Sequence, residues 1–362
     1  MRLALDGRVL QSRPIGGIGR IVRAVLPELG AAGVAGIDLL VDDRLAPPDL
    51  PSLSGIEVHS LRAPLSGRGV AWLELAAPRW LAGPGRERGV DVFHCPFYGL
   101  PRRQPVPMVV SIYDTTFLGR ASWVGPARRG VMRMQSRVAA RTAATIITGS
   151  ETVAGAISHQ LRVDPSRIVV AAPGPDAVFL AAGQRETQGE RAYVAALGGT
   201  RRRNLPVAIK AWHKVRSAWP DLGLLVLGTT KAAEGRGAES AGAAVTGPLD
   251  DAELARLLSG AVAFLYPTTY EGVGLPALEA MAAGTPVVCA PVGALPEVIG
   301  DAAEWCARPT VEDTAAALRR VLEDPGRRAG LARAGRCRAG ARPGPAAMAA
   351  VWADAYRGAT RA

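Results

Sequence analysis

The stretch that decides the fold is residues 261–289, which read AVAFLYPTTYEGVGLPALEAMAAGTPVVC. It opens with an apolar run, Ala261 to Leu265, and after a glycine-containing turn continues as a helical pattern from Pro276 to Ala283. A second apolar run follows at Pro286 to Cys289. Apolar strands on both sides of a helix are typical of a β-α-β unit in a parallel sheet that is buried on both faces. Pro276 suits the first helical turn, where an N–H would have no intrahelical partner.

The same alternation extends outward through the chain. In the first half, the expected strands are Arg2–Asp6, Ile37–Val41, Asp91–His94, Met108–Ile112, Thr145–Thr148 and Arg167–Ala171. In the second half they are Ala192–Leu197, Gly223–Leu227 and Ala243–Thr246, with helices around Pro206–Ala218 and Asp251–Ser259. This pattern predicts an α/β protein of two doubly wound, Rossmann-like domains. Ligands of such domains bind on loops that follow strands, so we expect the function in a cleft that the domains share.

The domain boundaries follow from length and composition. A chain of 362 residues is long enough for two domains. Residues 183–191, GQRETQGER, are polar and unpatterned, as an interdomain linker should be. We therefore expect domains at 1–182 and 183–342, followed by a terminal helix in 343–362. Met348, Val351, Trp352 and Tyr356 have helical spacing there, but the spacing leaves open which domain the helix packs on, the first being one option.

The composition excludes several classes of protein. With 48% hydrophobic and 21% charged residues, the chain is typical of folded rather than disordered proteins. Its formal net charge of +11 comes from 43 basic and 32 acidic residues, of which only Lys210, Lys214 and Lys231 are lysines. With the abundant Ala and Gly, this excess of Arg indicates a GC-rich coding bias, and no nucleic-acid-binding motif is present. We therefore expect no nucleic-acid partner.

The cysteines and the first residues bear on the compartment. Cys95, Cys289, Cys306 and Cys337 form no C-x-x-C pair, which argues against a zinc site or a disulfide framework and favours a reducing compartment. No stretch approaches the roughly 18 consecutive apolar residues of a membrane span. Asp6 and Arg8 interrupt the apolar start that a signal peptide needs. We therefore expect a cytoplasmic protein.

The turn and helix of residues 270–283 carry the chemistry. Gly272 and Gly274 lie between the strand and the helix, and the free N–H groups and positive dipole end of such a helix favour a diphosphate. Glu271 lies in the turn and Glu279 about one helical turn into the helix, so both can face one ligand. Carboxylates accept hydrogen bonds from pairs of sugar or ribose hydroxyls. Two glutamates at this spacing more often lie on a solvent-exposed face. Here the surrounding sequence pattern makes them candidates for a ligand site.

With these residues in place, the sequence resembles the retaining nucleotide-sugar glycosyltransferases of family 4, in particular their mannosyltransferase-like branch. The resemblance covers nearly the whole chain, and the E-x7-E segment is its most specific part. It implies the GT-B fold, with an acceptor-side first domain and a donor-binding second domain. It also implies that Glu279 binds the donor's ribose, while Glu271 binds the donor sugar and phosphates together with the backbone of Gly272, Val273, Gly274 and Leu275.

A second segment, residues 197–206, reads LGGTRRRNLP and looks like a shortened form of the family's Gly-Thr-…-Arg-Lys-Asn turn. The resemblance implies that Arg202 and Arg203 stabilise the charge that develops on the departing nucleoside diphosphate. Arg203 stands where the family has Lys, which keeps the charge but replaces a flexible ammonium with a planar guanidinium. The alternative is a basic exposed turn.

Glycine-containing turns at other strand ends are weaker signals. Residues 15–20 read IGGIGR and lack the G-x-G-x-x-G spacing. In the family, however, such a turn reaches the donor phosphates and the acceptor, which makes Gly16 and Gly17 expected donor contacts. Positions that line the diphosphate and the nucleobase in the family are occupied here by Gly228, Gly247 and Leu249. Ser150 is expected to cap the helix that follows it.

One departure from the family is Tyr113-Asp114, where His-Asp is usual. Tyrosine donates and accepts a hydrogen bond but does not carry a proton near neutral pH as imidazole does. Tyr113 and Asp114 are candidate sugar or acceptor contacts. His94, at the end of another strand, is a third candidate, although a lone His there is more often structural. Donor recognition therefore differs, or another group fills the role, or activity is impaired.

Arginines recur in the helix expected at Pro126–Ala143. Arg129, Arg133, Arg137 and Arg141 form an i, i+4 row. Such a row could rest on an anionic membrane and present a lipid-linked acceptor. A solvated helix face is the more common explanation.

These observations predict a retaining glycosyltransferase that moves a hexose from a nucleoside-diphosphate sugar, with GDP-mannose favoured, to a glycan, lipid-linked or small-molecule acceptor. No Asp-x-Asp sequence occurs, so we expect no metal, and no other cofactor. One alternative is a degenerate GT-B protein that binds nucleotide sugar or a partner protein without transfer. A GT-B epimerase or phosphorylase is another.

Overall fold

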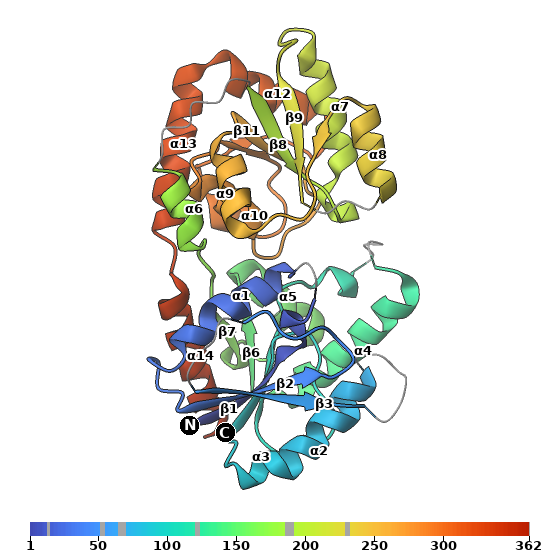
Figure 1. Cartoon of the computed structure of the whole chain (residues 1–362), viewed down its shortest axis with the longest axis vertical. Helices are drawn as coiled ribbons and strands as arrows, with labels where there is room; N and C mark the ends of the chain where they lie inside the picture. Colours follow the sequence, from blue (N-terminus) through green and yellow to red (C-terminus); the bar gives the residue numbers. More distant parts are fainter. Residues whose placement is uncertain are drawn as a thin grey trace. The chain divides into compact units, whose positions relative to one another are not determined.

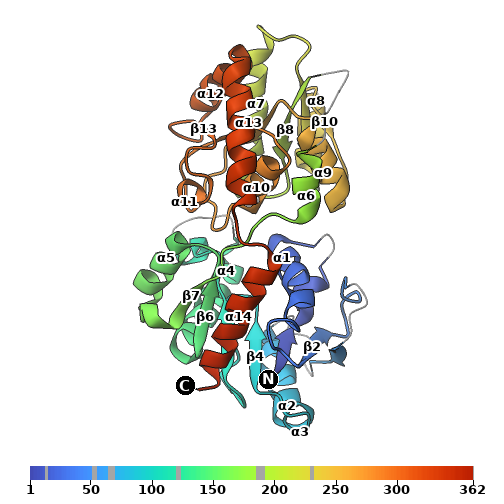
Figure 2. The ribbon, with the colours of Figure 1, turned by 90° about the vertical axis from the view of Figure 1, so that its left-hand side faces the viewer.

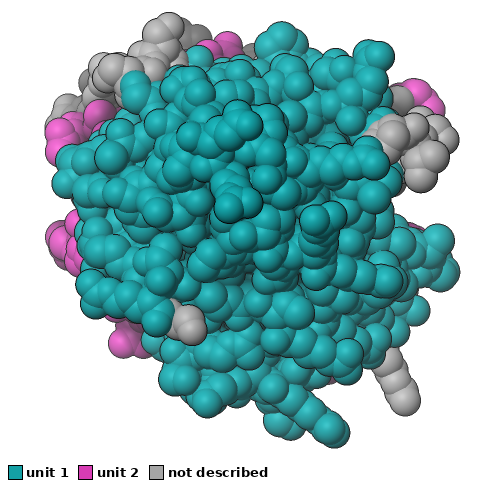
Figure 3. Space-filling view, turned by 90° about the horizontal axis from the view of Figure 1, so that it is seen from below, with its two compact units in different colours: residues 1–173, 343–362 teal, residues 174–342 magenta. Residues whose placement is uncertain are grey.

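The computed structural model describes residues 1–12, 15–50, 55–63, 70–119, 124–184, 192–228 and 232–361. The chain forms two compact units, one of residues 1–173 with 343–362 and the other of residues 174–342 (Figures 1 and 3). Each unit is built on its own parallel sheet, and each is an α/β domain. The expected fold class, α/β with two Rossmann-like domains, is confirmed.

In its described part, the first unit contains a seven-stranded parallel sheet in the order β3-β2-β1-β4-β5-β6-β7. The strands are β1 (Arg2–Asp6), β2 (Gly36–Asp42), β3 (Ile56–Leu61), β4 (Val92–Cys95), β5 (Met108–Ser111), β6 (Thr145–Thr148) and β7 (Ile168–Val170). β1 pairs with β2 on one side and with β4 on the other, so the strand order reverses there. This reversal is the switch point of a doubly wound sheet.

Helices cover this sheet. They are α1 (Gly17–Val25), α2 (Ala77–Ala82), α3 (Pro84–Glu87), α4 (Pro126–Thr142), α5 (Glu151–Leu161) and α14 (Pro345–Ala359), with short turns η1 (Gly7–Leu10), η2 (Leu26–Glu28), η3 (Trp72–Ala76), η4 (Thr116–Leu118) and η5 (Pro165–Arg167). One core cluster packs η3, α2, α4 and α5 against β4, β5 and β6. α14 contacts β5 and β6 and lies beside α1 (Figure 2). Ser150 caps α5 as expected, because its Oγ accepts a hydrogen bond from the N–H of Val153 at 3.2 Å.

The second unit repeats this connectivity. Its described residues form a six-stranded parallel sheet in the order β10-β9-β8-β11-β12-β13. The strands are β8 (Tyr193–Leu197), β9 (Gly223–Leu227), β10 (Ala244–Val245), β11 (Ala263–Tyr266), β12 (Val287–Cys289) and β13 (Glu304–Trp305). The helices are α6 (Ala177–Ala182), α7 (Leu205–Arg216), α8 (Ala232–Ser240), α9 (Asp251–Ser259), α10 (Leu275–Ala282), α11 (Leu295–Ile299), α12 (Val311–Glu323) and α13 (Pro325–Gly340), with the short turn η6 (Arg201–Arg203). β8 pairs with β9 and β11, so the switch point of this sheet lies between β8 and β11.

The central strand β11 explains the continuous apolar run at the start of residues 261–289. Its four residues are all buried, and successive side chains point to opposite faces of the sheet. Ala263 and Leu265 join the core that contains α7 and α12. Phe264 and Tyr266 join the core that contains α9 and α10. Because helices cover both faces, the strand has no polar face and shows no polar alternation.

Two strands are absent from the sequence prediction. β3 is half exposed, and Val58 on it is 48% exposed, because it lies at the edge of the first sheet. Its polar residues interrupt the apolar run that identifies a central strand. β13 has only two residues and is too short to carry a pattern. Both omissions are at sheet edges, where tertiary pairing rather than hydrophobicity defines the strand.

The boundary between the units differs from the expectation. The division falls after Pro173, not after residue 182, because α6 belongs to the second unit. Phe179 of α6 is fully buried in the core that also contains Leu258 and Leu278. Of the linker expected at 183–191, residues 185–191 lie outside the described residues.

The terminal helix expected in 343–362 is α14, and it belongs to the first unit. Trp352 and Tyr356 are fully buried there. The helix therefore forms part of the first domain's core. The helical spacing of its residues had left open which domain it packs on.

Candidate active site

The expected donor-site residues of the second unit lie on loops at one edge of its sheet. Strands β8, β9, β10 and β11 are neighbours and run parallel, so their carboxyl ends meet at the same edge. The loops that follow them carry Arg202 and Arg203, Gly228, Gly247 and Leu249, and Glu271 to Leu275 respectively. In doubly wound sheets, ligands bind outside the carboxyl ends of the strands, at the switch point. Here the switch point lies between the loops of Arg202 and Glu271.

Arg202 and Glu271 form the central pair of this edge. The Nη1 atom of Arg202 lies 3.6 Å from Oε1 of Glu271. The side chain of Glu271 is 6% exposed and that of Arg202 is 28% exposed. The pair thus places a cation and a carboxylate at the mouth of the switch point, with the carboxylate set deeper.

The backbone of Arg202 is fixed by the loop after β11. Its carbonyl oxygen accepts hydrogen bonds from the N–H of Thr269 at 2.9 Å, from Oγ1 of Thr268 at 3.0 Å and from Oγ1 of Thr269 at 3.2 Å. The loop after β8 and the loop after β11 are therefore joined before any ligand binds. The sequence analysis assigned no role to Thr268 or Thr269, because their partner lies in a distant part of the chain.

Arg203 lies against its own loop. Its Nη1 donates a hydrogen bond to the carbonyl oxygen of Gly198 at 2.5 Å. Its Nε is buried and has no hydrogen-bond partner among the described residues. Arg202 and Arg203 are adjacent in sequence, but their guanidinium groups have different partners.

The turn that begins α10 depends on a glycine. Gly274 has a φ of +81°, and a Cβ there would lie 3.2 Å from Cδ2 of Leu295. Such a backbone conformation favours glycine. Gly274 allows the chain to turn from the Glu271 loop into α10, where Glu279 is 4% exposed.

A second glycine, Gly293, lets another loop approach Glu271. Its φ is +56°, and a Cβ there would lie 2.1 Å from the carbonyl oxygen of Glu271. The same carbonyl accepts a hydrogen bond from the N–H of Ala294 at 2.8 Å. The loop after β12 thus supports the backbone of Glu271. No motif in the sequence marks Gly293, because the need for glycine arises from a tertiary contact.

The lining residues after β9 and β10 are also joined. The N–H of Gly228 donates a hydrogen bond to Oγ1 of Thr246 at 3.0 Å. Gly247 is exposed beside this contact, and Leu249 is half-buried against the core of α9 and α10. These three residues are placed at the same sheet edge as Glu271, consistent with lining a ligand.

Comparisons with known proteins agree with this geometry. Residues 16–174 match the family described as "Glycosyl transferase 4-like domain", and residues 182–338 match "Glycosyl transferases group 1". Together the two matches cover most of the chain. The chain belongs to the GT4-type glycosyltransferases.

Relatives and fold neighbours are consistent with that family. The glycogen synthase of Mycobacterium tuberculosis (strain H37Rv) is 32% identical over 282 residues, which cover 71% of this chain and 66% of the relative. The MMP alpha-(1->4)-mannosyltransferase of Mycolicibacterium hassiacum is 49% identical over 81 residues, or 21% of this chain and 20% of the relative. The chain therefore spans just under two thirds of the length of the first of these relatives and a fifth of the second.

Solved structures show the same fold. WaaG, a glycosyltransferase involved in lipopolysaccharide biosynthesis, superposes with a TM-score of 0.78 at 17% identity, covering 98% of this chain and 99% of that one. HepE of Anabaena, solved with UDP and glucose, gives a TM-score of 0.69 at 15% identity and covers 96% of both chains. The family and these neighbours identify the two-domain fold as GT-B.

The remaining expected contacts of this GT4-type chain lie in the first unit. Gly16 has an extended backbone and precedes α1, which begins at Gly17, so both lie on the loop that follows β1 and η1. Asp114 accepts hydrogen bonds at Oδ1 from the N–H of Thr116 at 2.7 Å and from its hydroxyl at 2.6 Å. Asp114 therefore shapes the turn after β5. Its contact with a sugar stays a prediction.

His94 is hydrogen-bonded inside the first unit, as the structural alternative of the sequence analysis has it, and its contact with a sugar stays a prediction. The side chain is fully buried in the first unit. Nδ1 lies 2.8 Å from the hydroxyl of Tyr356, and Nε2 lies 2.8 Å from Oγ of Ser111. Burial lowers the pKa of His94 to about 3, so the imidazole is neutral. Nδ1 therefore joins β4 to α14, and Nε2 joins β4 to β5, so both ring nitrogens are already engaged inside the unit.

Tyr113, which replaces the family's usual histidine, also turns inward. The residue is 6% exposed, and its hydroxyl has no hydrogen-bond partner in the described part of the chain. Burial raises the pKa of Tyr113 well above its usual value, which keeps the phenol neutral near neutral pH. The phenol is close enough to Tyr356 of α14 to affect the pKa of that residue. The Tyr113 hydroxyl is thus buried in the first unit, and its contact with a sugar stays a prediction.

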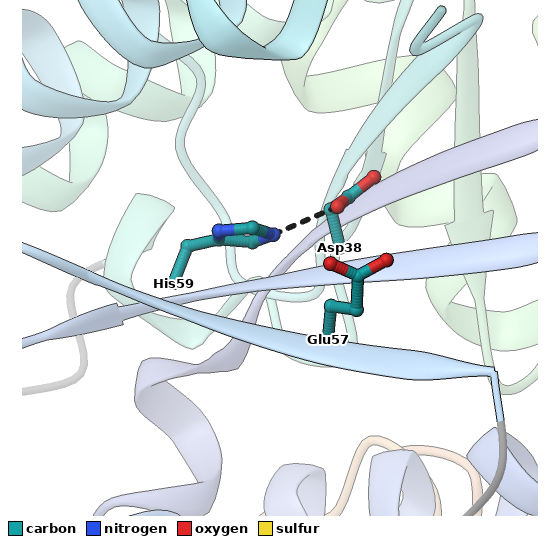
Figure 4. Close-up of side chains that lie close together, drawn as sticks. All are labelled: Asp38, Glu57 and His59. Carbon is teal, nitrogen blue, oxygen red and sulfur yellow. Dashed lines mark hydrogen bonds and ion pairs between the residues drawn. The ribbon is translucent and has the colours of Figure 1, made fainter. Parts of the chain in front are cut away.

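One group of metal-ligand side chains occurs in the described ranges, at the start of β2 and β3. Asp38, Glu57 and His59 lie close together, and Nε2 of His59 is 2.8 Å from Oδ1 of Asp38 (Figure 4). Arg2 and Arg88 donate to Asp38 at 2.6 and 2.7 Å. Burial alone would raise the pKa of Asp38, but these hydrogen bonds hold it below its usual value. Arg2 and Arg88 pair with both Asp38 and Glu57, so this group at the amino ends of β2 and β3 is an ion-pair network rather than a metal site.

The arginine row of α4 is only partly exposed. Arg133 turns inward and donates hydrogen bonds to the carbonyl oxygens of Phe117 at 2.8 Å and Leu118 at 2.9 Å. Arg137 and Arg141 are exposed, whereas Arg129 is half-buried. Arg133 therefore fixes the turn of η4 and does not contribute to an exposed basic row, and the membrane contact of the row stays a prediction. Among the described helices, none has both the length and the apolar character needed to cross a bilayer.

Proposed function

We propose that this chain transfers a hexose from a nucleoside-diphosphate sugar to an acceptor hydroxyl, with retention at the anomeric carbon and without a metal ion. The observation that carries the proposal is the Arg202–Glu271 pair at the switch point of the second sheet. A cation suited to a diphosphate and a carboxylate suited to sugar hydroxyls meet there, at the edge that binds ligands in doubly wound sheets. The GT4-type family supports the same function.

Each residue of this edge has a chemical role in the proposal. The bond between the anomeric carbon and the diphosphate oxygen breaks, and a bond to the acceptor oxygen forms on the same face of the sugar. An oxygen of the departing diphosphate takes the acceptor's proton. Arg202 and Arg203 stabilise the negative charge that grows on the diphosphate. Glu271 orients the donor sugar, and Glu279 accepts hydrogen bonds from the ribose hydroxyls.

GDP-mannose is the favoured donor in this proposal. The segment similar to a mannosyltransferase is 49% identical, although it covers 21% of this chain. The similarity to a glycogen synthase is lower but covers 71% of this chain, which keeps glucosyl donors as the alternative. The identity of the nucleoside diphosphate that binds distinguishes GDP-mannose from the other donors.

For the acceptor, a lipid-linked molecule on an anionic membrane is consistent with α4. Val131 and Met134 are 36% and 39% exposed on this helix, which also exposes Arg137 and Arg141 and carries no acidic residue. Exposed apolar side chains beside arginines suit the interface of an anionic bilayer. Exchanging both arginines for Glu should reduce sedimentation with anionic vesicles, whereas the same change at the exposed Arg236 and Arg333 of the second unit should not. Equal sedimentation of both variants would contradict the membrane contact.

Thermal stability with nucleoside diphosphates tests the donor site. GDP, UDP, ADP and dTDP are compared, each with and without magnesium. A ligand that binds only the folded state stabilises it by about 2.7 kcal/mol at 100 times its Kd. We expect one diphosphate to raise the melting temperature equally with and without magnesium. Glu279→Ala should abolish this shift, and Glu239→Ala, at an exposed position of α8 in the same unit, should retain it.

The outcomes separate the proposal from its main alternative. A shift that requires magnesium would contradict the metal-independent site, and no shift in folded protein would contradict the donor site. The inward-facing Tyr113 is the observation that favours a degenerate GT-B protein. Binding of a nucleotide sugar without transfer or hydrolysis would select that alternative.

A further inference from the structure

The residue that holds Glu271 is Tyr266, the last residue of β11. Its hydroxyl donates a hydrogen bond to Oε2 of Glu271 at 2.5 Å. The ring is 1% exposed and stacks on Phe264, with centroids 5.4 Å apart and an angle of 20° between the rings. A side chain packed in this way has little freedom to rotate. The hydroxyl therefore meets Glu271 in one fixed direction.

The two oxygens of the Glu271 carboxylate consequently have different surroundings. Oε2 accepts the hydrogen bond of Tyr266, whereas Oε1 lies 3.6 Å from Arg202, beyond the distance of a hydrogen bond. The two oxygens of Glu271 thus have separate partners, the phenol of Tyr266 on one and the guanidinium of Arg202 near the other.

The charges around Tyr266 keep it a donor. Burial raises the pKa of Tyr266 well above its ordinary value, and the negative charge of Glu271 raises it further, against the opposing effect of Arg202 and Arg203. The remaining ionisable residue on the adjoining α10 is the buried Glu279. Burial and the charge of Glu271 therefore favour the protonated phenol, the form that can donate to the carboxylate.

We propose that Tyr266 is a positioning residue, which holds the Glu271 carboxylate in one orientation so that its other oxygen faces the donor sugar. This inference rests on the proposed function only in naming the donor sugar as the group that the other oxygen of Glu271 contacts. The hydrogen bond and its effect on the carboxylate are independent of that function.

Tyr266→Phe keeps the ring and removes the donor. A buried carboxylate that loses a hydrogen bond is less stable as an anion, so its pKa rises. Hydrogen bonds to charged groups are strong enough to move a titration midpoint by about one to two pH units. Tyr193→Phe is the matched control, because the hydroxyl of Tyr193 donates to the carbonyl oxygen of Leu257 at 2.6 Å in the same unit, away from Glu271.

The experiment is a pH titration of the full-length protein labelled with ¹³C at the glutamate carboxyls, followed by NMR. Glu271→Gln identifies the resonance of Glu271. We expect Tyr266→Phe to raise the midpoint of that resonance by about one pH unit or more and Tyr193→Phe to leave it unchanged. Should Tyr266→Phe not fold, 3-fluorotyrosine at position 266 keeps the test, because this stronger donor of nearly the same size should lower the midpoint. A midpoint that is unchanged by the change at position 266 would overturn the proposal.

Binding of the nucleotide sugar that stabilises the wild type then tests the link to the donor. As the pH falls, the affinity of Tyr266→Phe for this nucleotide sugar should begin to decline at a pH at least about one unit higher than in the wild type. Tyr193→Phe should behave as the wild type does. Coincident pH profiles would overturn the positioning role. If the wild type binds no nucleotide sugar but Tyr266→Phe still moves the titration midpoint of Glu271, the proposed function fails. The hydrogen bond by which Tyr266 positions Glu271 is then still supported.

Discussion

At the scale of single residues, His94 shows how burial decides between two roles of the same side chain. The sequence places it at the end of a parallel strand, where a catalytic or binding histidine would lie. In the folded first unit it is fully buried between Ser111 and the Tyr356 of α14. The position in the sequence was read correctly, but the partners come from residues far along the chain. A buried, doubly bonded imidazole is a structural group.

This burial predicts a pH dependence of stability. The pKa of His94 is lowered from 6.5 to about 3, so between these values the unfolded chain binds a proton that the folded chain does not. The free energy of unfolding should therefore fall as the pH falls below 6.5, with His94 contributing about 1.4 kcal/mol per pH unit. Urea denaturation from pH 7 to pH 4.5 measures it. The slope should be smaller in His94→Gln by that amount, and equal slopes in the two proteins would contradict the assignment.

Arg202, Arg203 and Glu271 show how much of the candidate site could be predicted from the sequence. Their positions after strands, together with the resemblance to family 4, predicted that they belong to one donor site. The structure pairs Arg202 with Glu271 but directs Arg203 to the carbonyl of Gly198. Sequence could not distinguish the two neighbouring arginines, because the partner of Arg202 lies on a loop far along the chain and is known only once the sheet has formed.

At the scale of elements, the loop after β12 supports the loop after β11. Gly293 approaches the carbonyl of Glu271, and Ala294 donates a hydrogen bond to it. The helix α10 and its turn were predictable from the apolar pattern, the glycines and Pro276. The support from residues 293–294 was not, because it depends on two loops that meet only when β11 and β12 pair.

Gly293→Ala should therefore disturb the donor site. Its Cβ would lie 2.1 Å from the oxygen of Glu271, and the φ of +56° is unfavourable for alanine. We expect a loss of at least about 1–3 kcal/mol in the free energy of unfolding, together with weaker nucleotide binding. Gly330→Ala in α13 has open space around the new Cβ and should stabilise by about 0.4–1 kcal/mol. Equal stability of the two variants, measured by denaturation, would show that the loop adapts without strain.

At the scale of the whole molecule, the chain leaves the first unit after Pro173 and returns to it at Pro343. The returning helix α14 contributes Trp352 and Tyr356 to the interior of the first unit, both fully buried. The first domain therefore depends on residues that follow the entire second domain. Folding of the first unit requires the far end of the chain.

A chain that ends at Arg342 should lose the first unit and keep the second. Removing one large buried aromatic side chain costs about 3–5 kcal/mol, and a whole domain is stable by only about 5–15 kcal/mol. In hydrogen exchange, the amides of β4, β5 and β6 should lose protection, while those of β8, β11 and β12 should keep it. A chain shortened only by residues 360–362 is the control. Full protection of β5 and β6 in the truncated chain would refute the dependence on α14.

The sequence by itself determined the parallel α/β class, the position of the central strands and the loops that carry the candidate site. These features depend on local apolar runs, helical periodicity and turn residues, which act within a few neighbouring residues. Tertiary structure alone decided that α6 joins the second unit, that α14 completes the first, and that His94 and Tyr113 face inward. It also decided that Tyr266 and Gly293 hold Glu271. These properties depend on contacts between segments that are distant in sequence, and a buried hydrogen bond or a close backbone approach exists only once both segments are in place.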